Sequence, residues 1–395
     1  MKAVRTSIFW LHLAVGCIAG LVILVMSVTG VLLAFERQIN NWADAPAVLQ
    51  SASGASAPMP LDALLASLSA GGQGTPSQLV LHNSVRAPVE ARFGRSRTLF
   101  LNPWTGEIVG QPSTTTRAFF GSIERLHRSL GLGMRNAFGR GITGAANLGF
   151  LFMLISGAYL WLPRIFNLSS LRSRLLFRGG LTGRAREWNW HNVIGIWTLV
   201  PLFVIVLSGV IMSYPWASNL LFTLTGSKPP AFGWRGEGSP EHPSHAAPGS
   251  TLPHSLSLDA LTATARQQIP AWKSITVEVP QPDARALDLN VDTSIGGQPD
   301  KSTQLVLNRQ SGQILAVKRF DGNSLGSRLR AYARFLHTGE ELGITGEIIA
   351  ALASLGAVFL VWTGISMALR RAFARKSGTL SAQDARSSSR EQVTV

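Results

Sequence analysis

Four long runs of this chain contain no charged residue, and no other feature of the sequence limits its possible folds as strongly. The runs cover residues 6–35, 141–163, 188–214 and 348–369. A helix needs about 20 apolar residues to cross the hydrocarbon core of a bilayer, so each run is long enough to span it. We therefore predict a membrane α-helical protein with four transmembrane helices, in preference to four buried helices of a soluble core.

The first run could also be read as a signal peptide, because Lys2 and Arg5 precede it. Its apolar stretch is far longer than the roughly 7–15 residues typical of a signal peptide, and no small-residue cleavage site follows it. We expect it to be a retained anchor. The single cysteine, Cys17, lies within this run, so the chain can form neither an internal disulfide nor a thiol pair for redox or zinc chemistry.

The basic residues that flank the runs predict an orientation. They precede the first run, fill the loop between the second and third, and follow the fourth: Lys2, Arg5, Arg164, Arg172, Arg174, Arg178, Arg184, Arg186, Arg370, Arg371, Arg375 and Lys376. Four crossings place all of them on one side, which should be cytoplasmic together with both termini. This pattern explains much of the net charge of +15. No aromatic–basic motif supports nucleic-acid binding, so the expected partner is the lipid bilayer.

The runs divide the chain into alternating membrane and soluble parts. The expected parts are a first helix (1–35), a soluble domain (36–116), a histidine segment with a second helix (117–163), a basic loop (164–187), a third helix (188–214), a second soluble domain (215–327), a histidine segment with a fourth helix (328–370) and a tail (371–395). Residues 51–60 and 236–250 are predicted flexible links. His242 and His245 lie in the second link, where a solvated loop is favoured over a metal-binding tract.

An internal repeat relates the two halves of the chain. Leu61-Asp-Ala-Leu64 matches Leu258-Asp-Ala-Leu261, and Leu101-Asn-Pro-Trp-Thr-Gly-Glu-Ile108 matches Leu307-Asn-Arg-Gln-Ser-Gly-Gln-Ile314. The first match opens a short helix, and the second reads as a strand, a tight turn and another strand. Alternating residues around 89–101 and 287–291 suit a sheet with one wet face. We expect two helix–domain–helix repeats, each with one small α+β domain, arranged about a pseudo-twofold axis.

The repeat continues into the apolar runs and places four histidines in pairs. His12 and His191 begin the outward-going runs, each eighteen residues before a glycine, so both should lie near the cytoplasmic face. His127 and His337 precede the inward-going runs and should lie near the opposite face. Ser156-Gly157 and Thr363-Gly364 occupy matching places in the second and fourth runs.

Imidazole is the usual axial ligand of a haem that carries electrons, so each histidine pair is a candidate to hold one haem between facing helices. A single histidine here would more simply bind water at headgroup level, but the paired placement favours ligation. Gly16, Gly20 and Gly195 would admit a flat macrocycle or would serve ordinary close helix packing. Zinc is a weaker alternative because the pairs lie at opposite faces.

Other chemistry finds little support in the sequence. The chain contains no H-E-x-x-H motif, no nucleophile elbow and no G-x-G-x-x-G motif opening a helix after a strand. The interiors of the four runs lack Asp and Glu, which argues against an ion-coupled pump.

The chain resembles the PepSY-associated transmembrane helix family over residues 1 to about 375. The resemblance lies in Trp10-Leu-His12 with Thr29-Gly30, Leu126-His-Arg-Ser-Leu130, Trp190-His-Asn192 with Ser208-Gly209, and Phe335-Leu-His-Thr-Gly339. The turns Thr105-Gly-Glu-Ile108 and Ser311-Gly-Gln-Ile314 resemble the hairpin of a PepSY domain. The two soluble domains would accordingly be PepSY-like and periplasmic.

This resemblance implies a multi-pass protein of the bacterial inner membrane that reduces ferric siderophores. It implies two b-type haems, one held by His12 and His191 and the other by His127 and His337. Because the sequence ends soon after the fourth run, we expect a separate electron donor, either quinol or a cytoplasmic flavoprotein. Arg125, Arg128 and Arg334 could pair with haem propionates or equally with lipid phosphate. PepSY domains also occur as inhibitory or chaperone-like modules, so a non-enzymatic membrane scaffold or partner-binding protein remains the alternative.

Overall fold

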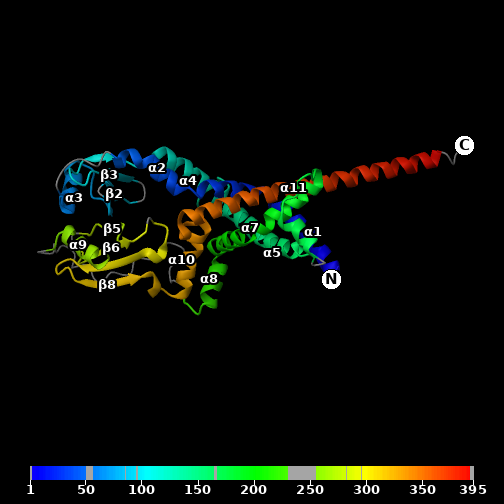
Figure 1. Ribbon diagram of the computed structural model, residues 1–395. Helices are drawn as coiled ribbons and strands as arrows, with labels where there is room; N and C mark the ends of the chain where they lie inside the picture. Colours follow the sequence, from blue (N-terminus) through cyan, green and yellow to red (C-terminus); the bar gives the residue numbers. More distant parts are fainter. Residues whose placement is uncertain are drawn as a thin grey trace.

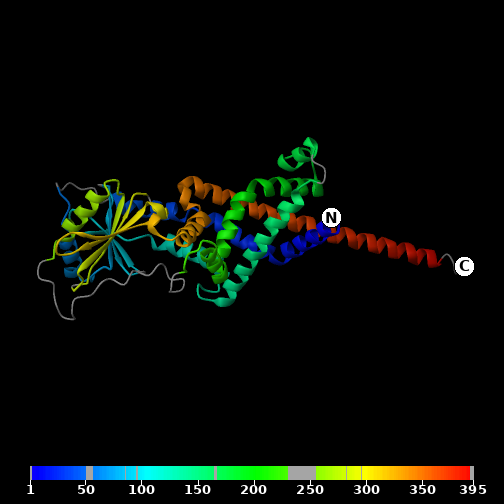
Figure 2. The ribbon, with the colours of Figure 1, turned by 90° about the horizontal axis from the view of Figure 1, so that it is seen from below.

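The computed structural model describes residues 2–49, 57–84, 86–94, 97–163, 167–229, 255–281, 283–294 and 296–391. The molecule is elongated, with a β-sheet and its helices at one end and a helical bundle at the other (Figure 1). A perpendicular view shows the same two parts (Figure 2). The chain begins and ends on the side of the bundle away from the sheet, which we call the distal end; the opposite end is the proximal end.

Four described helices are long and apolar enough to cross a membrane, as the charge-free runs predicted. They are α1 (Lys2–Leu33), α5 (Ala137–Trp161), α7 (Gly183–Ser213) and α11 (Gly343–Glu391). α1 and α7 each pack against both α5 and α11, so α1 and α7 occupy opposite corners of a four-helix bundle. Ile18, Leu21 and Val200 point outward and are largely exposed, which suits a lipid environment.

Close helix packing accounts for the three glycines that were considered for a macrocycle. A Cβ added at Gly16 would meet Met153, and one at Gly20 would meet Ile365. Gly195 lies against Leu360. These glycines therefore contact neighbouring helices of the bundle, as close helix packing requires.

The soluble part contains one eight-stranded antiparallel sheet in the order β4-β3-β2-β1-β5-β6-β7-β8. The strands are β1 (Gln78–His82), β2 (Val89–Phe93), β3 (Arg97–Leu101), β4 (Ile108–Gly110), β5 (Ser274–Glu278), β6 (Ala286–Asp292), β7 (Ser302–Asn308) and β8 (Ile314–Arg319). Each half of the chain contributes four strands and one helix, α3 (Leu61–Ala70) or α9 (Leu258–Gln268).

The two predicted soluble domains are thus joined rather than separate. β1 pairs with β5 along its whole length, with Val80 opposite Thr276. One apolar core runs beneath both halves and includes Leu64, Leu79 and Leu287. The physical reason is the edge strand: in separate four-stranded sheets, β1 and β5 would each present unpaired backbone groups, and their pairing removes both edges.

The repeated sequence motifs explain how the halves fit together. The Leu61 backbone N–H donates to Asp259 Oδ2 at 2.7 Å, and the Leu258 N–H donates to Asp62 Oδ2 at 2.9 Å. Each Leu-Asp-Ala-Leu segment therefore caps the helix of the other half, an interaction typically worth about 1 kcal/mol per cap. The predicted tight turns are also present, with Gly106 at φ 73° in the left-handed region that favours glycine.

Shorter helices connect the sheet to the bundle. They are α2 (Glu36–Leu49), α4 (Thr114–Ser129), α6 (Leu168–Leu175), α8 (Pro215–Leu224), α10 (Leu325–Thr338) and the 3-10 turns η1 (Pro299–Lys301), η2 (Phe320–Gly322) and η3 (Glu340–Leu342). α2 prolongs α1 after a short turn, so the predicted domain at 36–116 begins with a helix. α4 packs against α1 and α5, and α10 packs against α7, α8 and α11. Of the predicted links, residues 51–56 and 236–250 lie outside the described residues, as does His254.

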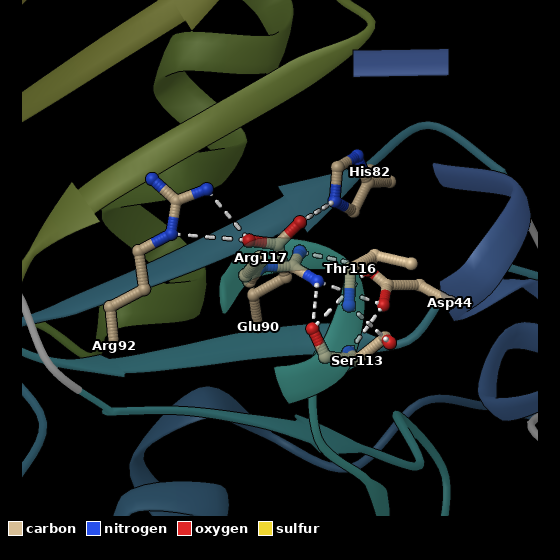
Figure 3. A network of polar contacts seen from close by, with 7 residues as sticks. All are labelled: Asp44, His82, Glu90, Arg92, Ser113, Thr116 and Arg117. Carbon is tan, nitrogen blue, oxygen red and sulfur yellow. Dashed lines mark hydrogen bonds and ion pairs between the residues drawn. The ribbon is translucent and has the colours of Figure 1, made fainter. Parts of the chain in front are cut away.

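Ion pairs fasten the sheet side to the bundle. Arg117 of α4 binds both carboxylate oxygens of the buried Asp44 of α2, at 3.0 and 2.7 Å, and the Ser113 N–H donates to the same carboxylate (Figure 3). Arg37 binds Glu347 at 2.8 Å, which joins α2 to the start of α11. Bidentate arginine–carboxylate pairs fix orientation as well as distance, so these contacts hold α2 and α4 in place.

A second polar network lies on the sheet itself (Figure 3). Glu90 accepts from Arg92 at 2.7 Å and contacts His82 Nε2 at 3.0 Å. Burial alone would raise the pKa of Glu90, but the hydrogen bonds and charges of His82 and Arg92 outweigh it and lower the pKa. His82 therefore has a hydrogen-bond partner within the sheet.

Candidate functional site

Four histidines lie at two levels of the helical bundle. His12 on α1 and His191 on α7 lie toward the distal end and form the distal pair, beside Ser156 of α5 and Thr363 of α11. His127 on α4 and His337 on α10 form a proximal pair, with ring centroids 6.3 Å apart and ring planes at 71°. The structure thus brings the histidines together in the combinations that the sequence predicted.

The two levels are well separated along the bundle. His12 and Thr29, which contacts the proximal pair, stand on the same helix, and 17 residues at about 1.5 Å each place them roughly 26 Å apart. This separation is most of the roughly 30 Å hydrocarbon thickness of a bilayer. The two pairs therefore lie near opposite faces of the apolar part of the bundle.

Each histidine binds a hydroxyl group on a neighbouring helix through Nδ1. The four contacts are His12 to Ser156 Oγ at 2.8 Å, His191 to Thr363 Oγ1 at 2.9 Å, His127 to Thr29 Oγ1 at 2.9 Å and His337 to Ser208 Oγ at 3.2 Å. The same nitrogen is engaged in all four cases. Nε2 of each ring has no hydrogen-bond partner within the described part of the chain.

The hydroxyl protons decide which way these hydrogen bonds run. Each hydroxyl donates to a carbonyl of its own helix: Thr29 to Val25 at 2.7 Å, Thr363 to Phe359 at 2.7 Å, Ser208 to Ile205 at 2.8 Å and Ser156 to Met153 at 3.3 Å. A hydroxyl has one proton, so when it donates to its own helix its oxygen accepts from the histidine. We assign the ring proton to Nδ1 on this basis, which leaves the lone pair on Nε2.

A backbone carbonyl reinforces this assignment at His337. Its Nδ1 lies 2.8 Å from the Ile205 carbonyl oxygen, which can only accept a hydrogen bond. A histidine anchored by an Nδ1–H donor is the form that binds metals through Nε2.

A glycine follows each of the four hydroxyl residues, and it makes room for the ring. A Cβ added at Gly157 would lie 3.3 Å from His12 Cε1, and one at Gly209 would lie 3.3 Å from His337 Cε1. The corresponding distances are 3.5 Å at Gly364 for His191 and 3.8 Å at Gly30 for His127. The hydroxyl–glycine dipeptide thus fixes both the hydrogen bond and the close approach of the imidazole edge.

The sequence contained these dipeptides only as markers of the repeat, and their role as histidine partners was missed. A signal was present, because Thr29-Gly30 and Ser208-Gly209 follow a histidine at the same spacing, and Ser156-Gly157 and Thr363-Gly364 occupy equivalent places. The sequence does not identify which histidine each dipeptide binds, because that histidine stands on another helix.

The proximal pair has the dimensions of a two-imidazole metal site. With metal–nitrogen bonds of about 2.0–2.1 Å, two imidazoles bound to one ion through Nε2 have ring centres roughly 6 Å apart. The observed 6.3 Å agrees. No cluster of three or more His, Cys, Asp or Glu side chains suited to a metal occurs among the described residues. A haem needs only two axial ligands from the protein, so the donor set fits haem better than zinc.

The three arginines that could pair with haem propionates each contact a protein side chain. Arg125 donates to Ser122 Oγ at 2.7 Å, Arg128 to Glu124 at 2.8 Å, and Arg334 lies over the Phe335 ring. These contacts leave the choice between propionate and lipid phosphate as the sequence left it.

At the distal end, arginines close the last turn of α5. Arg5 donates to the carbonyls of Leu160 and Leu162 at 2.6 and 3.0 Å, and Arg174 donates to that of Trp161. Cations at a helix C-terminus satisfy its last carbonyls and favour its dipole. The start of α1 and the α6 segment are thereby attached to α5 below the distal pair.

No curated protein matches the chain. A family model described as PepSY-associated TM region matches residues 9–371, a range that contains all four histidines, all four hydroxyl–glycine dipeptides and both halves of the sheet. The chain therefore belongs to the PepSY-associated transmembrane family.

Proposed function

We propose that this protein is a bacterial inner-membrane electron relay with two b-type haems, which reduces ferric siderophores on the periplasmic side and so releases iron. The observation that carries the proposal is the state of the four histidines. Each has its Nδ1 proton engaged by a neighbouring helix and its Nε2 lone pair available, and they come together as two pairs.

The distribution of charge supports the orientation in this proposal. Basic residues at the distal end include Lys2, Arg5, Arg172, Arg174, Arg178, Arg184, Arg186, Arg370 and Arg371. The short connection between α5 and α7 carries three of them and the first turn of α7 carries two more, and short loops with their flanking helix ends are what the positive-inside rule weighs most heavily. The distal end would accordingly be cytoplasmic, and the sheet periplasmic.

The residues of the chain would hold and orient the haems, and the haems would supply the electron transfer. A haem with two imidazole ligands supplies one-electron transfer and leaves no iron position for oxygen or substrate. His12 and His191 would hold the distal haem, and His127 and His337 the proximal one. Ser156, Thr363, Thr29 and Ser208 would keep each ring in its Nδ1–H form. This arrangement has no need of a catalytic acid or base.

Placement determines the direction of electron flow. The proximal pair lies on the side of the sheet, so a ferric chelate would take its electron there, and a separate quinol or cytoplasmic flavoprotein would deliver electrons at the distal pair. Iron(II) binds most siderophores more weakly than iron(III), so one-electron reduction would release the metal. The ferric siderophore is the substrate in this scheme.

Reoxidation of the reduced protein tests the proposal. We expect a ferric siderophore to reoxidise the chemically reduced protein and an iron(II) chelator to capture the product. His337→Ala should slow this reaction strongly while leaving a distal centre that can still be reduced. Reoxidation that ignores every ferric chelate would contradict the reductase function, and a colourless protein would favour the non-enzymatic scaffold.

A further inference from the structure

A buried carboxylate stands one helical turn from the distal histidine pair. Glu187 lies four residues before His191 on α7, so the two side chains share a face of that helix. Its side chain is 5% exposed. It is the one acidic residue of α1, α6 and α7. A buried ionisable group in a membrane-spanning helix is expensive and marks a functional site by default.

Only one of the two oxygens of this carboxylate has hydrogen-bond partners among the described residues. Oε1 accepts from Ser366 Oγ at 2.8 Å and from Arg370 Nε at 3.1 Å. Oε2 is buried and has no hydrogen-bond partner among the described residues. Leaving a buried charged oxygen unpaired is costly, whereas a proton on that oxygen removes the charge.

The hydrogen bonds of Glu187 and His191 form a continuous row of contacts between α7 and α11. His191 binds Thr363, and Glu187 binds Ser366 and Arg370, which lie on the same face of α11 one and two turns further along. Because Glu187 is buried one helical turn from His191, a charge placed between His12 and His191 acts on Glu187 with little screening by solvent.

We propose that Glu187 is a proton-binding site coupled to reduction of the distal centre. This inference rests on the proposed function. One electron from the external donor enters the distal centre, and one proton from the solvent on that side forms an O–H bond at Glu187 Oε2. The added negative charge and the added positive charge cancel, so the buried end of the bundle keeps its net charge.

The groups around Glu187 leave it as the proton acceptor. Arg370 faces it from α11 and is 55% exposed, so its positive charge is partly screened by solvent. Trp161 at the end of α5 has a buried Nε1 that is unpaired within the described residues, but this group only donates. The other charged side chains described at this end are basic, and they include Arg5 on α1, Arg172 and Arg174 on α6, Arg178 before α7, Arg184 and Arg186 on α7, and Arg371 on α11. Arginine stays protonated in proteins, so none of these groups can take the proton.

A redox titration of the full chain tests this site. The His337→Ala background isolates the distal centre, whose visible spectrum then reports its midpoint potential as the pH is changed across the neutral range. We expect the potential to fall as the pH rises, because reduction carries a proton with it. Glu187→Gln should remove this dependence, while the matched variant Glu124→Gln, which breaks an exposed ion pair with Arg128, should retain it.

A proton-uptake measurement and a second variant complete this test. On dithionite reduction in unbuffered solution, after subtraction of the protons that oxidation of dithionite itself releases, the Glu187 protein should take up protons and Glu187→Gln should take up none. If Glu187→Gln does not fold, Arg370→Gln keeps the carboxylate, and its pH dependence should move to higher pH. A potential that ignores pH, or a slope that survives Glu187→Gln, would overturn the proton site and leave the haem relay intact. A protein without haem would overturn both.

Discussion

The His337 Nδ1 atom donates to the Ile205 carbonyl oxygen at 2.8 Å, in addition to its contact with Ser208 at 3.2 Å. His12 has no such carbonyl, and Ser156 Oγ is its one Nδ1 partner within the described residues. The four histidine sites therefore share a pattern but differ in how firmly each ring is held.

This difference predicts unequal effects of removing the hydroxyls. Ser156→Ala should weaken haem binding at the distal pair by about tenfold, which is the lower end of what the loss of a ligand's hydrogen-bond partner costs. Ser208→Ala should cost less, because Ile205 still holds His337. Haem titration of the apoprotein gives both affinities, with Ser122→Ala as a control on a helix surface. Equal losses at Ser156 and Ser208 would show that the carbonyl contact is unimportant.

The glycine beside each hydroxyl predicts a steric effect. A Cβ at Gly209 would lie 2.9 Å from Asn147 Nδ2 and 3.3 Å from His337 Cε1, so Gly209→Ala should displace the ring at a cost of about 1–3 kcal/mol. We expect the proximal haem to be lost or spectrally altered. The matched control is Gly121→Ala in α4, where the added Cβ meets only the flexible Arg125 side chain at 3.6 Å. A normal proximal spectrum in Gly209→Ala would refute the steric role.

The Glu90 network predicts a dependence of sheet stability on pH (Figure 3). Since the pKa of Glu90 is lowered in the folded protein, its contribution is fully present above the unfolded pKa and is lost as the pH falls through the folded pKa. Glu90→Gln should therefore destabilise the sheet at neutral pH, by about 1 kcal/mol, and the difference from wild type should vanish in acid. Thermal unfolding followed by tryptophan fluorescence measures this. Glu107→Gln, on an exposed turn, is the control, and a constant difference at all pH values would contradict the account.

Orientation can be measured independently of the histidines. Reporters fused after Arg178 or at Val395 should read cytoplasmic, and reporters near Gly74 or Gly297 should read periplasmic. The reason is the excess of basic residues at the distal end. A periplasmic signal after Arg178 would reverse the direction of electron flow in the proposal.

Sequence predicted the limits of α1, α5 and α7 closely, because the loss of charge and its return mark them, whereas α11 continues past the fourth run to Glu391, through most of the predicted tail. The run at 188–214 corresponds to α7 (Gly183–Ser213), and the run at 141–163 to α5 (Ala137–Trp161). The pairing of the histidines also followed from sequence, since His12 and His191 begin membrane helices and His127 and His337 lie just before the other two, which fixes the depth of each. Depth, however, says nothing of side-chain contacts.

What sequence could not predict are the contacts between distant segments. Nothing local in β1 or β5 shows that each completes the other's sheet, so two domains were predicted where one continuous sheet exists. His191 and Thr363 are 172 residues apart, and only the assembled bundle brings them together. Glu187 lies just outside the charge-free run, so it was not considered as a buried group.

The most direct test of the central claim is a haem count on the purified chain and its histidine variants. We predict two haems for each chain and the reduced spectrum of six-coordinate b-type centres. His12→Ala and His191→Ala should each remove the same single haem, the double variant should remove no more, and His127→Ala and His337→Ala should both remove the other. A colourless protein, or loss of one common haem in His12→Ala and His337→Ala, would contradict the paired sites.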